Sequence, residues 1–269
     1  MNILFITTDD PVGRHVLSGI AKSYAPCKTL SFFWSSATSK PKSYFPTPRR
    51  ILGQLNGYAR NMSEDRRSTK VNQLLGDTPI SFPNEERIAT RFANSKATGE
   101  LISSFQPDIM IVCGGPILRE RIFGIPKICT INIHFGISSG YRGQHTLLWP
   151  MLDNRFDQMG ATVHKIDAGV DTGHLLFEVY PDIAAEDDAV SLELKIADGI
   201  VDPFVEMLNR IENSKQQELV GKPLAHSGKE IRYNDLSLWK LAWFGIKRRL
   251  GAVKPPTTTG RNELFYEVS

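Results

Sequence analysis

Apolar positions near the start of the chain fall into a strand–helix–strand pattern. Residues 2–7 form a short apolar run typical of a buried strand, and residues 28–34 form a second one. Between them, residues 11–24 place apolar side chains at helical spacing. This order predicts a parallel, Rossmann-like sheet. The turn before the helix carries Asp9 and Asp10, so we expect Asp9 to cap the helix and the turn not to bind phosphate.

The middle of the chain continues this alternation of strands and helices. Four apolar runs predict further strands, over residues 109–113, 129–133, 161–166 and 175–180. Helical spacing predicts a helix over residues 84–105, with Glu85 and Glu86 in its first turn. A second, long amphipathic helix is predicted over residues 187–211, with Pro203 as a point where it kinks or splits. We therefore expect an α/β fold with a mainly parallel sheet.

Two segments depart from this plan. Residues 35–77 are a polar, basic insertion with interleaved aromatic side chains, in which residues 51–60 predict a short helix. This insertion either binds anionic groups of a ligand or is a solvated flap. Residues 213–269 form a small C-terminal appendage to a larger domain of residues 1–212. Its predicted helix, over residues 236–250, mixes aromatic and basic side chains, which is typical of a nucleotide or RNA contact or of an amphipathic packing face.

The composition is ordinary for a soluble globular protein. The 269 residues are 41% hydrophobic with a formal charge of +3, and no apolar run is long enough to span a bilayer. The N-terminus lacks the pattern of a secretory signal, so we expect a cytoplasmic protein with no membrane partner. Cys113 and Cys129 fall on predicted core strands, and Cys27 completes no metal-binding spacing, so we expect reduced thiols and no metal site.

Polar side chains cluster where the later strands end. Asn132 and His134 close one strand and, standing two residues apart, point to the same side of the sheet. The next strand carries Thr162 and His164 in alternation, and Asp171 follows in a turn. Open α/β sheets bind their ligands at such strand ends. An amide, an imidazole and a carboxylate are therefore expected at one site.

Four motifs in this region occur in a recognisable order. They are N-x-H at residues 132–134, Y-R-G at 141–143, G-x-T-x-H at 160–164 and D-x-G at 171–173. As an ordered set they resemble the folate-dependent formyltransferases, which include the glycinamide ribonucleotide, methionyl-tRNA and nucleotide-sugar enzymes. The resemblance implies a Rossmann-like formyltransferase domain and 10-formyltetrahydrofolate as the co-substrate that donates the formyl group.

The resemblance also implies roles for individual residues. Asn132, His134 and Asp171 match the catalytic asparagine, histidine and aspartate of the family. The residues expected to contact the folate are Gly115, Ile117, Leu118, Asp167 and Gly169, although residues 115–118 also fit a strand-to-helix turn with core side chains. The residues expected to contact the acceptor are Arg142, His145 and His164.

The chemistry of formyl transfer fits these residue types. The reacting carbon becomes tetrahedral and bears an oxyanion, and the attacking amine must lose one proton. An Asn132 amide can donate to that oxygen without titrating, and His134 can donate to it or move a proton near neutral pH. Asp171 can orient or charge the imidazole, and His164 can orient Asp171. Taken singly, each residue also fits a structural role, as a cap, a backbone-bonded histidine or a turn former.

The identity of the acceptor rests largely on elimination. The chain reads Phe135-Gly136-Ile137-Ser138-Ser139 where the family usually reads P-S-L-L-P, so acceptor contacts cannot be carried over from the family. The C-terminal appendage is short for an RNA-binding domain, which disfavours methionyl-tRNA as the acceptor. The first turn lacks a glycine-rich phosphate cradle, which disfavours glycinamide ribonucleotide. No regulatory domain precedes the first strand, which disfavours a formyl-folate hydrolase. We therefore expect an amino sugar carried on a nucleotide, with nucleic acid an unlikely partner and a homodimer left open. A hydroxyornithine-type amine, methionyl-tRNA or a non-catalytic folate or nucleotide binder are the alternatives.

Overall fold

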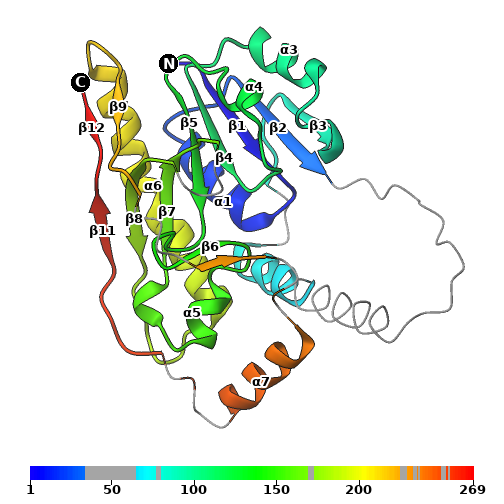
Figure 1. Ribbon diagram of the computed structural model, residues 1–269, viewed down its shortest axis with the longest axis vertical. Helices are drawn as coiled ribbons and strands as arrows, with labels where there is room; N and C mark the ends of the chain where they lie inside the picture. The colour runs from blue at the N-terminus through cyan, green and yellow to red at the C-terminus, as the bar shows by residue number, and fades with distance from the viewer. Residues whose placement is uncertain are drawn as a thin grey trace, which may run out of the picture.

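The computed structural model describes most of the chain (Figure 1). The described residues are 1–33, 65–76, 80–168, 173–224, 229–232, 235, 237–249, 253 and 255–269. Of the predicted features, the helix over residues 51–60 and most of the basic insertion lie outside these ranges, as do Gly169 and Asp171. Within the insertion, residues 65–75 form a helix that the sequence pattern did not predict.

One sheet of eight strands, in the order β11-β8-β7-β5-β4-β1-β2-β3, organises the molecule. Five strands are parallel neighbours: β1 (Ile3–Thr7), β2 (Lys28–Phe33), β3 (Glu85–Ala89), β4 (Ile109–Cys113) and β5 (Cys129–His134). Three more join antiparallel to the β5 edge: β7 (Ala161–Lys165), β8 (Leu175–Tyr180) and β11 (Arg261–Leu264). The α/β fold with a mainly parallel sheet is confirmed.

The strand order reverses between β1 and β4, because β2 and β3 extend the sheet to one side of β1 while β4 and β5 extend it to the other. Ligands of open α/β sheets bind outside the carboxyl ends of the strands at such a reversal. The strand topology therefore directs attention to the ends of β1, β4 and β5.

Helices cover both faces of the sheet because successive strand side chains point to opposite faces (Figure 1). Ile3 and Phe5 of β1 pack in a core with α1 (Pro11–Ala21) and α6 (Ala189–Asn213). Leu4 and Ile6 pack on the other face with α3 (Lys96–Ser104) and α4 (Glu120–Phe123). All four side chains are at most 1% exposed, as expected for a central strand covered on both sides.

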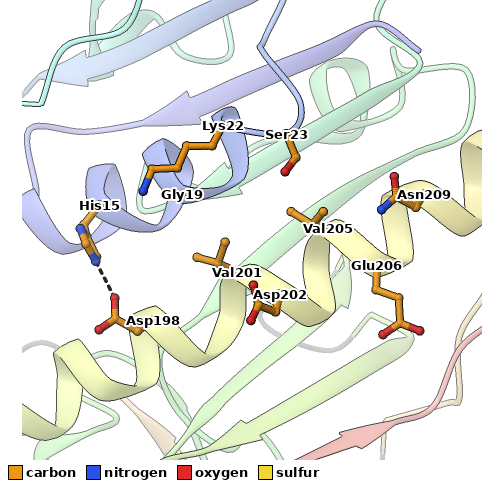
Figure 2. A pocket seen from close by; sticks show the side chains of 10 residues that line it. All are labelled: His15, Gly19, Lys22, Ser23, Asp198, Val201, Asp202, Val205, Glu206 and Asn209. Carbon is orange, nitrogen blue, oxygen red and sulfur yellow. Dashed lines mark hydrogen bonds and ion pairs between the residues drawn. The ribbon is translucent and has the colours of Figure 1, made fainter.

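The two helices on the first face, α1 and α6, pack closely. A Cβ on Gly19 of α1 would lie 2.6 Å from Val201 of α6, so only a glycine permits this approach. Beside the contact, His15 Nε2 and the Asp198 carboxylate form a hydrogen bond at 2.7 Å across an open groove of about 530 Å³ (Figure 2). The polar pairing and the small-residue contact together hold α6 against α1.

Helix α6 begins at a capping box. The Asp188 carboxylate accepts from Ser191 N, and the Ser191 hydroxyl accepts from Asp188 N. Pro203 lies inside the helix, which continues to Asn213, so of the two predicted alternatives, a kink or a split, the split is wrong. An interior proline costs about 3 kcal/mol. The fully buried Ile200 and Phe204 on either side of it offset this cost.

Residues 84–105 do not form the single predicted helix. They form β3, a short 3₁₀ turn over Thr90–Phe92, and then α3. Glu85 does not serve a helix N-terminus, because it binds Arg14 of α1 from the edge strand. The cap of α3 is Ser95, whose hydroxyl accepts from Thr98 N. At α1, the cap is Asp10, which accepts from Gly13 N at 2.9 Å, and not Asp9 as expected.

The C-terminal appendage contributes strands to three sheets. Its last residues supply β11 of the main sheet, and β12 (Glu267–Val268) pairs with β9 (Leu219–Val220). Its β10 (Lys229–Ile231) pairs in parallel with β6 (Tyr141–Gly143). The domain boundary at residue 212 stays a prediction. Across the described ranges, no helix has the length and apolar character needed to cross a membrane.

Candidate active site

Asn132 and His134 stand at the carboxyl end of β5, as their spacing predicted. Across the antiparallel pair, Asn132 lies opposite His164 of β7 and His134 lies opposite Thr162. The Asn132 amide nitrogen and His164 Nε2 are 3.2 Å apart. The pairing of β5 with β7 thus brings the N-x-H and G-x-T-x-H motifs into direct contact.

The surroundings of His164 fix its tautomer. His164 Nδ1 lies 2.8 Å from the carbonyl oxygen of Lys165, which can only accept a hydrogen bond. We therefore infer that Nδ1 carries the proton and that Nε2 accepts from the Asn132 amide. His164 is 2% exposed, so its ring is held by packing as well. One consequence is that the orientation of the Asn132 amide is set by its strand partner.

His134 sits against a tight loop that only a glycine can form. Gly136 has a φ of +153°, and a Cβ there would come within 3.0 Å of His134 Nε2 and 2.6 Å of Thr146. The Thr162 hydroxyl donates to Gly136 O at 2.7 Å and accepts from Ser138 N at 3.0 Å. The loop that departs from the family pattern is therefore anchored by the threonine of G-x-T-x-H.

A cavity of about 940 Å³ opens beside these residues at the strand ends, and it is called the main cavity below. Its apolar wall comes from β4, the turn after it and the end of β7: Val112, Pro116, Ile117, Leu118 and Ile166. Its polar wall includes Asn132, His134, His145, His164 and Asp167. The volume is near the upper end of the roughly 300–1,000 Å³ typical of ligand sites.

Most of the sequence-predicted site residues meet at this cavity. Gly115, Ile117, Leu118 and Asp167 line it, as do His145 and His164. Arg142 does not line it; it lies in β6 opposite Glu230 of β10, while the next residue, Gly143, reaches the cavity wall. Asp171 and Gly169 lie outside the described residues. The roles of all these residues stay predictions.

One side of the main cavity carries a network of charged groups that the motifs did not reveal. Arg67 donates to both carboxylate oxygens of Glu193, at 2.7 and 2.5 Å, and to Asp10 at 2.8 Å. Burial alone would lower the pKa of Arg67, but its bonds to Glu193 and Asp10 outweigh burial and raise that pKa. Lys70 pairs with Asp188 at the start of α6. These contacts hold the 65–75 helix over the cavity.

The ionisation of Asp188 follows from its partners. Burial would raise the pKa of this carboxyl, but hydrogen bonds from Lys70 and from Ser191 N outweigh burial and lower it. Asp188 therefore remains charged at neutral pH.

Arg66 lines the main cavity from the 65–75 helix. The described end of the basic insertion, for which ligand binding and a solvated flap were both left open, therefore borders the main cavity.

The C-terminal appendage also reaches the main cavity. Leu241 and Phe244 of α7 (Leu238–Arg249) line it. At β6, Gly143 has a φ of +97°, and a Cβ there would lie 2.2 Å from Ile231 O of β10. The cavity that holds His134 is therefore bordered both by the described end of the basic insertion and by α7.

The described residues contain no cluster of histidine, cysteine and acidic side chains that could hold a metal ion. Cys113 is fully buried, and burial raises the pKa of its thiol. Burial likewise raises the pKa of the Cys129 thiol to about 11. Both thiols are therefore protonated at neutral pH and do not resemble nucleophiles or metal ligands.

Comparison with known proteins identifies similar sequences. A family model described as Formyl transferase matches residues 63–208. The methionyl-tRNA formyltransferase of Legionella pneumophila (strain Corby) is 28% identical over 187 residues, which cover 68% of this chain and 56% of that protein. The chain spans about half the length of the curated relatives it matches.

Solved structures of low sequence identity share the fold. A 4-N formyltransferase from Francisella tularensis has a TM-score of 0.56 at 14% identity, covering 87% of this chain and 77% of that one. A sugar N-formyltransferase from a Shewanella species has a TM-score of 0.54 at 14% identity, covering 87% and 78%. At this identity, the likeness concerns the arrangement of the backbone.

Proposed function

Since the chain belongs to the formyl transferase family, we propose that it moves a formyl group from 10-formyltetrahydrofolate to a primary amine. One observation supports this most strongly: Asn132, His134 and His164 line a single large cavity at the carboxyl end of β5. An amide and an imidazole at this position are the groups that acyl transfer to an amine requires.

The apolar wall of the main cavity fits the formyl donor. Ile117 is 76% exposed although it is a large aliphatic side chain, and it stands on the cavity wall beside Leu118. A flat heterocycle such as a pterin would cover this surface, while Asp167 offers a carboxylate to its N–H groups. The donor would supply an activated formyl group, and the protein would supply its position.

Residue roles follow from the hydrogen-bond geometry. Asn132 donates to the formyl oxygen as negative charge develops there, because His164 holds its amide in one orientation. His134 donates to the same oxygen or receives the proton that leaves the attacking amine. Asp171, assigned from its D-x-G motif, charges or orients the His134 ring. A positioned acid–base group of this kind accelerates a reaction by roughly 10²–10⁴-fold.

For the acceptor we propose an amino sugar carried on a nucleotide. Arg66 on the cavity wall is a guanidinium suited to a phosphate, and Phe244 adds an aromatic side chain to the same wall, which suits a base. One of the solved structures with this fold is a sugar N-formyltransferase. Methionyl-tRNA is the second candidate, because the curated sequence relatives are methionyl-tRNA formyltransferases.

The test is release of tetrahydrofolate from 10-formyltetrahydrofolate by the purified full chain. Amino-sugar nucleotides, methionyl-tRNA and free amino acids would be offered in turn, and the formylated product identified by mass. We expect turnover with an amino-sugar nucleotide. Turnover with methionyl-tRNA alone would replace the sugar acceptor with the tRNA. The absence of turnover with all of them, combined with no stabilisation by a reduced-folate analogue, would reject formyl transfer.

A matched pair of variants separates chemistry from folding. His134→Ala should lower turnover by roughly 10²–10⁴-fold. His15→Ala should leave it unchanged, because His15 contacts Asp198 in the open groove between α1 and α6. Both variants should still be stabilised by a folate analogue that binds the folded state. Equal activity of the two variants would remove His134 from the reaction.

A further inference from the structure

Helix α7 exposes a stripe of large apolar side chains. Trp239 is 74% exposed, Trp243 57% and Ile246 47%. Their spacing of four and then three residues places all three on one face of the helix. Figure 1 shows α7 in orange at one end of the molecule, away from the main sheet. A contiguous apolar face of this kind on a folded protein marks an interaction surface.

This stripe is not the face by which α7 packs on its own protein. Leu241 and Phe244 face the main cavity, and Phe244 packs against the main core. Lys240 Nζ lies 4.4 Å from the ring centre of Trp149 in α5 (Leu148–Leu152) and donates to Asp235 O at 2.9 Å. Helix α7 therefore packs on its own protein through one side, and the opposite side, called the tryptophan stripe (Trp239, Trp243 and Ile246), stays exposed.

The charge of the surrounding chain has one sign. Between Asp235 and Glu263 the sequence contains six basic residues and no acidic one. The basic residues are Lys240, Lys247, Arg248, Arg249, Lys254 and Arg261. Three of them follow Ile246 directly, at the end of the helix that carries the stripe. A helix with large apolar side chains on one face and a run of three basic residues at its end complements a surface that is both anionic and apolar.

We propose that α7 docks on the surface of an anionic phospholipid membrane. Tryptophan side chains settle at the interface between headgroups and acyl chains, an aliphatic side chain enters the acyl boundary, and lysine and arginine contact the phosphates. Nucleic acid fits the stripe less well, because its binding relies on rows of cations, and Ile246 offers no ring on which a base can stack. The sequence alone led us to expect no membrane partner, because it has no apolar run long enough to span a bilayer and no secretory signal pattern. It does not reveal which side of α7 is exposed.

Docking would bring the main cavity to the membrane surface, because the same short helix lines that cavity with Leu241 and Phe244. Binding to lipid would therefore fix the position of one cavity wall. This inference does not depend on formyl transfer, and its test has no activity readout.

The test measures binding of the full chain to vesicles of phosphatidylcholine with and without phosphatidylserine. We expect co-sedimentation with the serine-containing vesicles, loss of binding in high salt, and quenching of tryptophan emission by brominated lipid. The double variant Trp239→Ser/Trp243→Ser should bind at least about tenfold more weakly, since each substitution removes a large buried apolar area in the bound state. The control Phe92→Ser changes an aromatic side chain that is 48% exposed on the 3₁₀ turn after β3, and it should bind normally.

Several outcomes would overturn the proposal. No binding to either vesicle type, or equal binding by wild type and the double variant, would reject it. If the double variant failed to fold, Ile246→Glu would replace it, and unchanged vesicle binding by that variant would count against the stripe. Binding to tRNA but not to vesicles would reject the membrane and assign the stripe to nucleic acid. A wild-type dimer that the variant turned into a monomer would reject the membrane and assign the stripe to a second copy of the chain.

Discussion

Glu85 offers a quantitative test of how the edge of the sheet is held. Its carboxylate accepts from Arg14 Nη1 at 2.9 Å and from Nη2 at 2.6 Å, joining β3 to α1. Phe82 N also donates to it, at 3.3 Å. The bonds from Arg14 outweigh the effect of burial and lower the pKa of Glu85 from 4.5 to about 2. Both side chains are largely buried, with 9% exposure for Arg14 and 14% for Glu85, so solvent screens the pair weakly.

The size of the effect follows from the two pKa values. An interval from 4.5 to about 2 corresponds to about 3 kcal/mol of stability at neutral pH. Because the pKa is lower in the folded state, this contribution is complete above pH 4.5 and is lost as the pH falls towards 2. At pH 3.5 the Glu85 carboxyl is mostly protonated in the unfolded chain but still mostly ionised in the folded chain. This difference lowers the contribution of Glu85 to the free energy of unfolding by about 1.4 kcal/mol.

The perturbation is Glu85→Gln, which keeps the shape of the side chain and removes its charge. Urea unfolding at pH 7 should show a loss of about 3 kcal/mol relative to wild type, and the loss should shrink to about 2 kcal/mol at pH 3.5. Glu86→Gln is the matched control. Glu86 is 42% exposed and pairs with Lys28 at 3.3 Å, so this change should alter stability by less than about 0.5 kcal/mol at either pH. A loss for Glu85→Gln that stayed below about 1 kcal/mol, or did not vary with pH, would refute the reasoning.

Three further predictions concern the main cavity. His134→Ala should fold and should lower kcat by roughly 10²–10⁴-fold in the tetrahydrofolate-release assay; a near-normal rate would contradict its role. Arg66→Glu should raise the KM for a nucleotide-sugar acceptor and leave folate-analogue binding unchanged, whereas an unchanged KM would make Arg66 a solvated residue. Gly143→Ala should destabilise the protein by about 1–3 kcal/mol in urea unfolding, because its Cβ would meet Ile231 O and its φ is unfavourable for alanine. A neutral result would mean that β6 and β10 are not held in the pairing described here.

The local pattern of apolar residues was sufficient to predict the bounds of strands that are buried on both faces. The strands over Ile109–Cys113 and Leu175–Tyr180 begin and end where the apolar runs do. Asn132 and His134 share a side because a strand alternates, and that too is a local property. The contact between Asn132 and His164 could not be predicted from local sequence, because it depends on the antiparallel pairing of β5 with β7.

The features that sequence reasoning missed depend on distant partners. Glu85 appeared suited to the first turn of a helix, but Arg14 lies 71 residues away and holds it in a strand. Arg67 appeared to be one of many solvated bases, but it is neutralised by Glu193, which is 126 residues away. Neither partner can be inferred from spacing along the chain. The exposed face of α7 was hidden for the same reason, because aromatic side chains do not indicate which of them will be covered.

The pairing of β11 with β8 has a consequence for synthesis of the protein on the ribosome. The edge of β8 can be completed only after Arg261–Leu264 have been made, long after the strands it joins. Until then, β8 presents unpaired backbone groups beside the buried side chains of Phe177 and Val179. An unfinished sheet with an open apolar edge is prone to pair with another chain. We therefore expect nascent chains that stop short of residue 261 to be the form of this protein that most needs a chaperone.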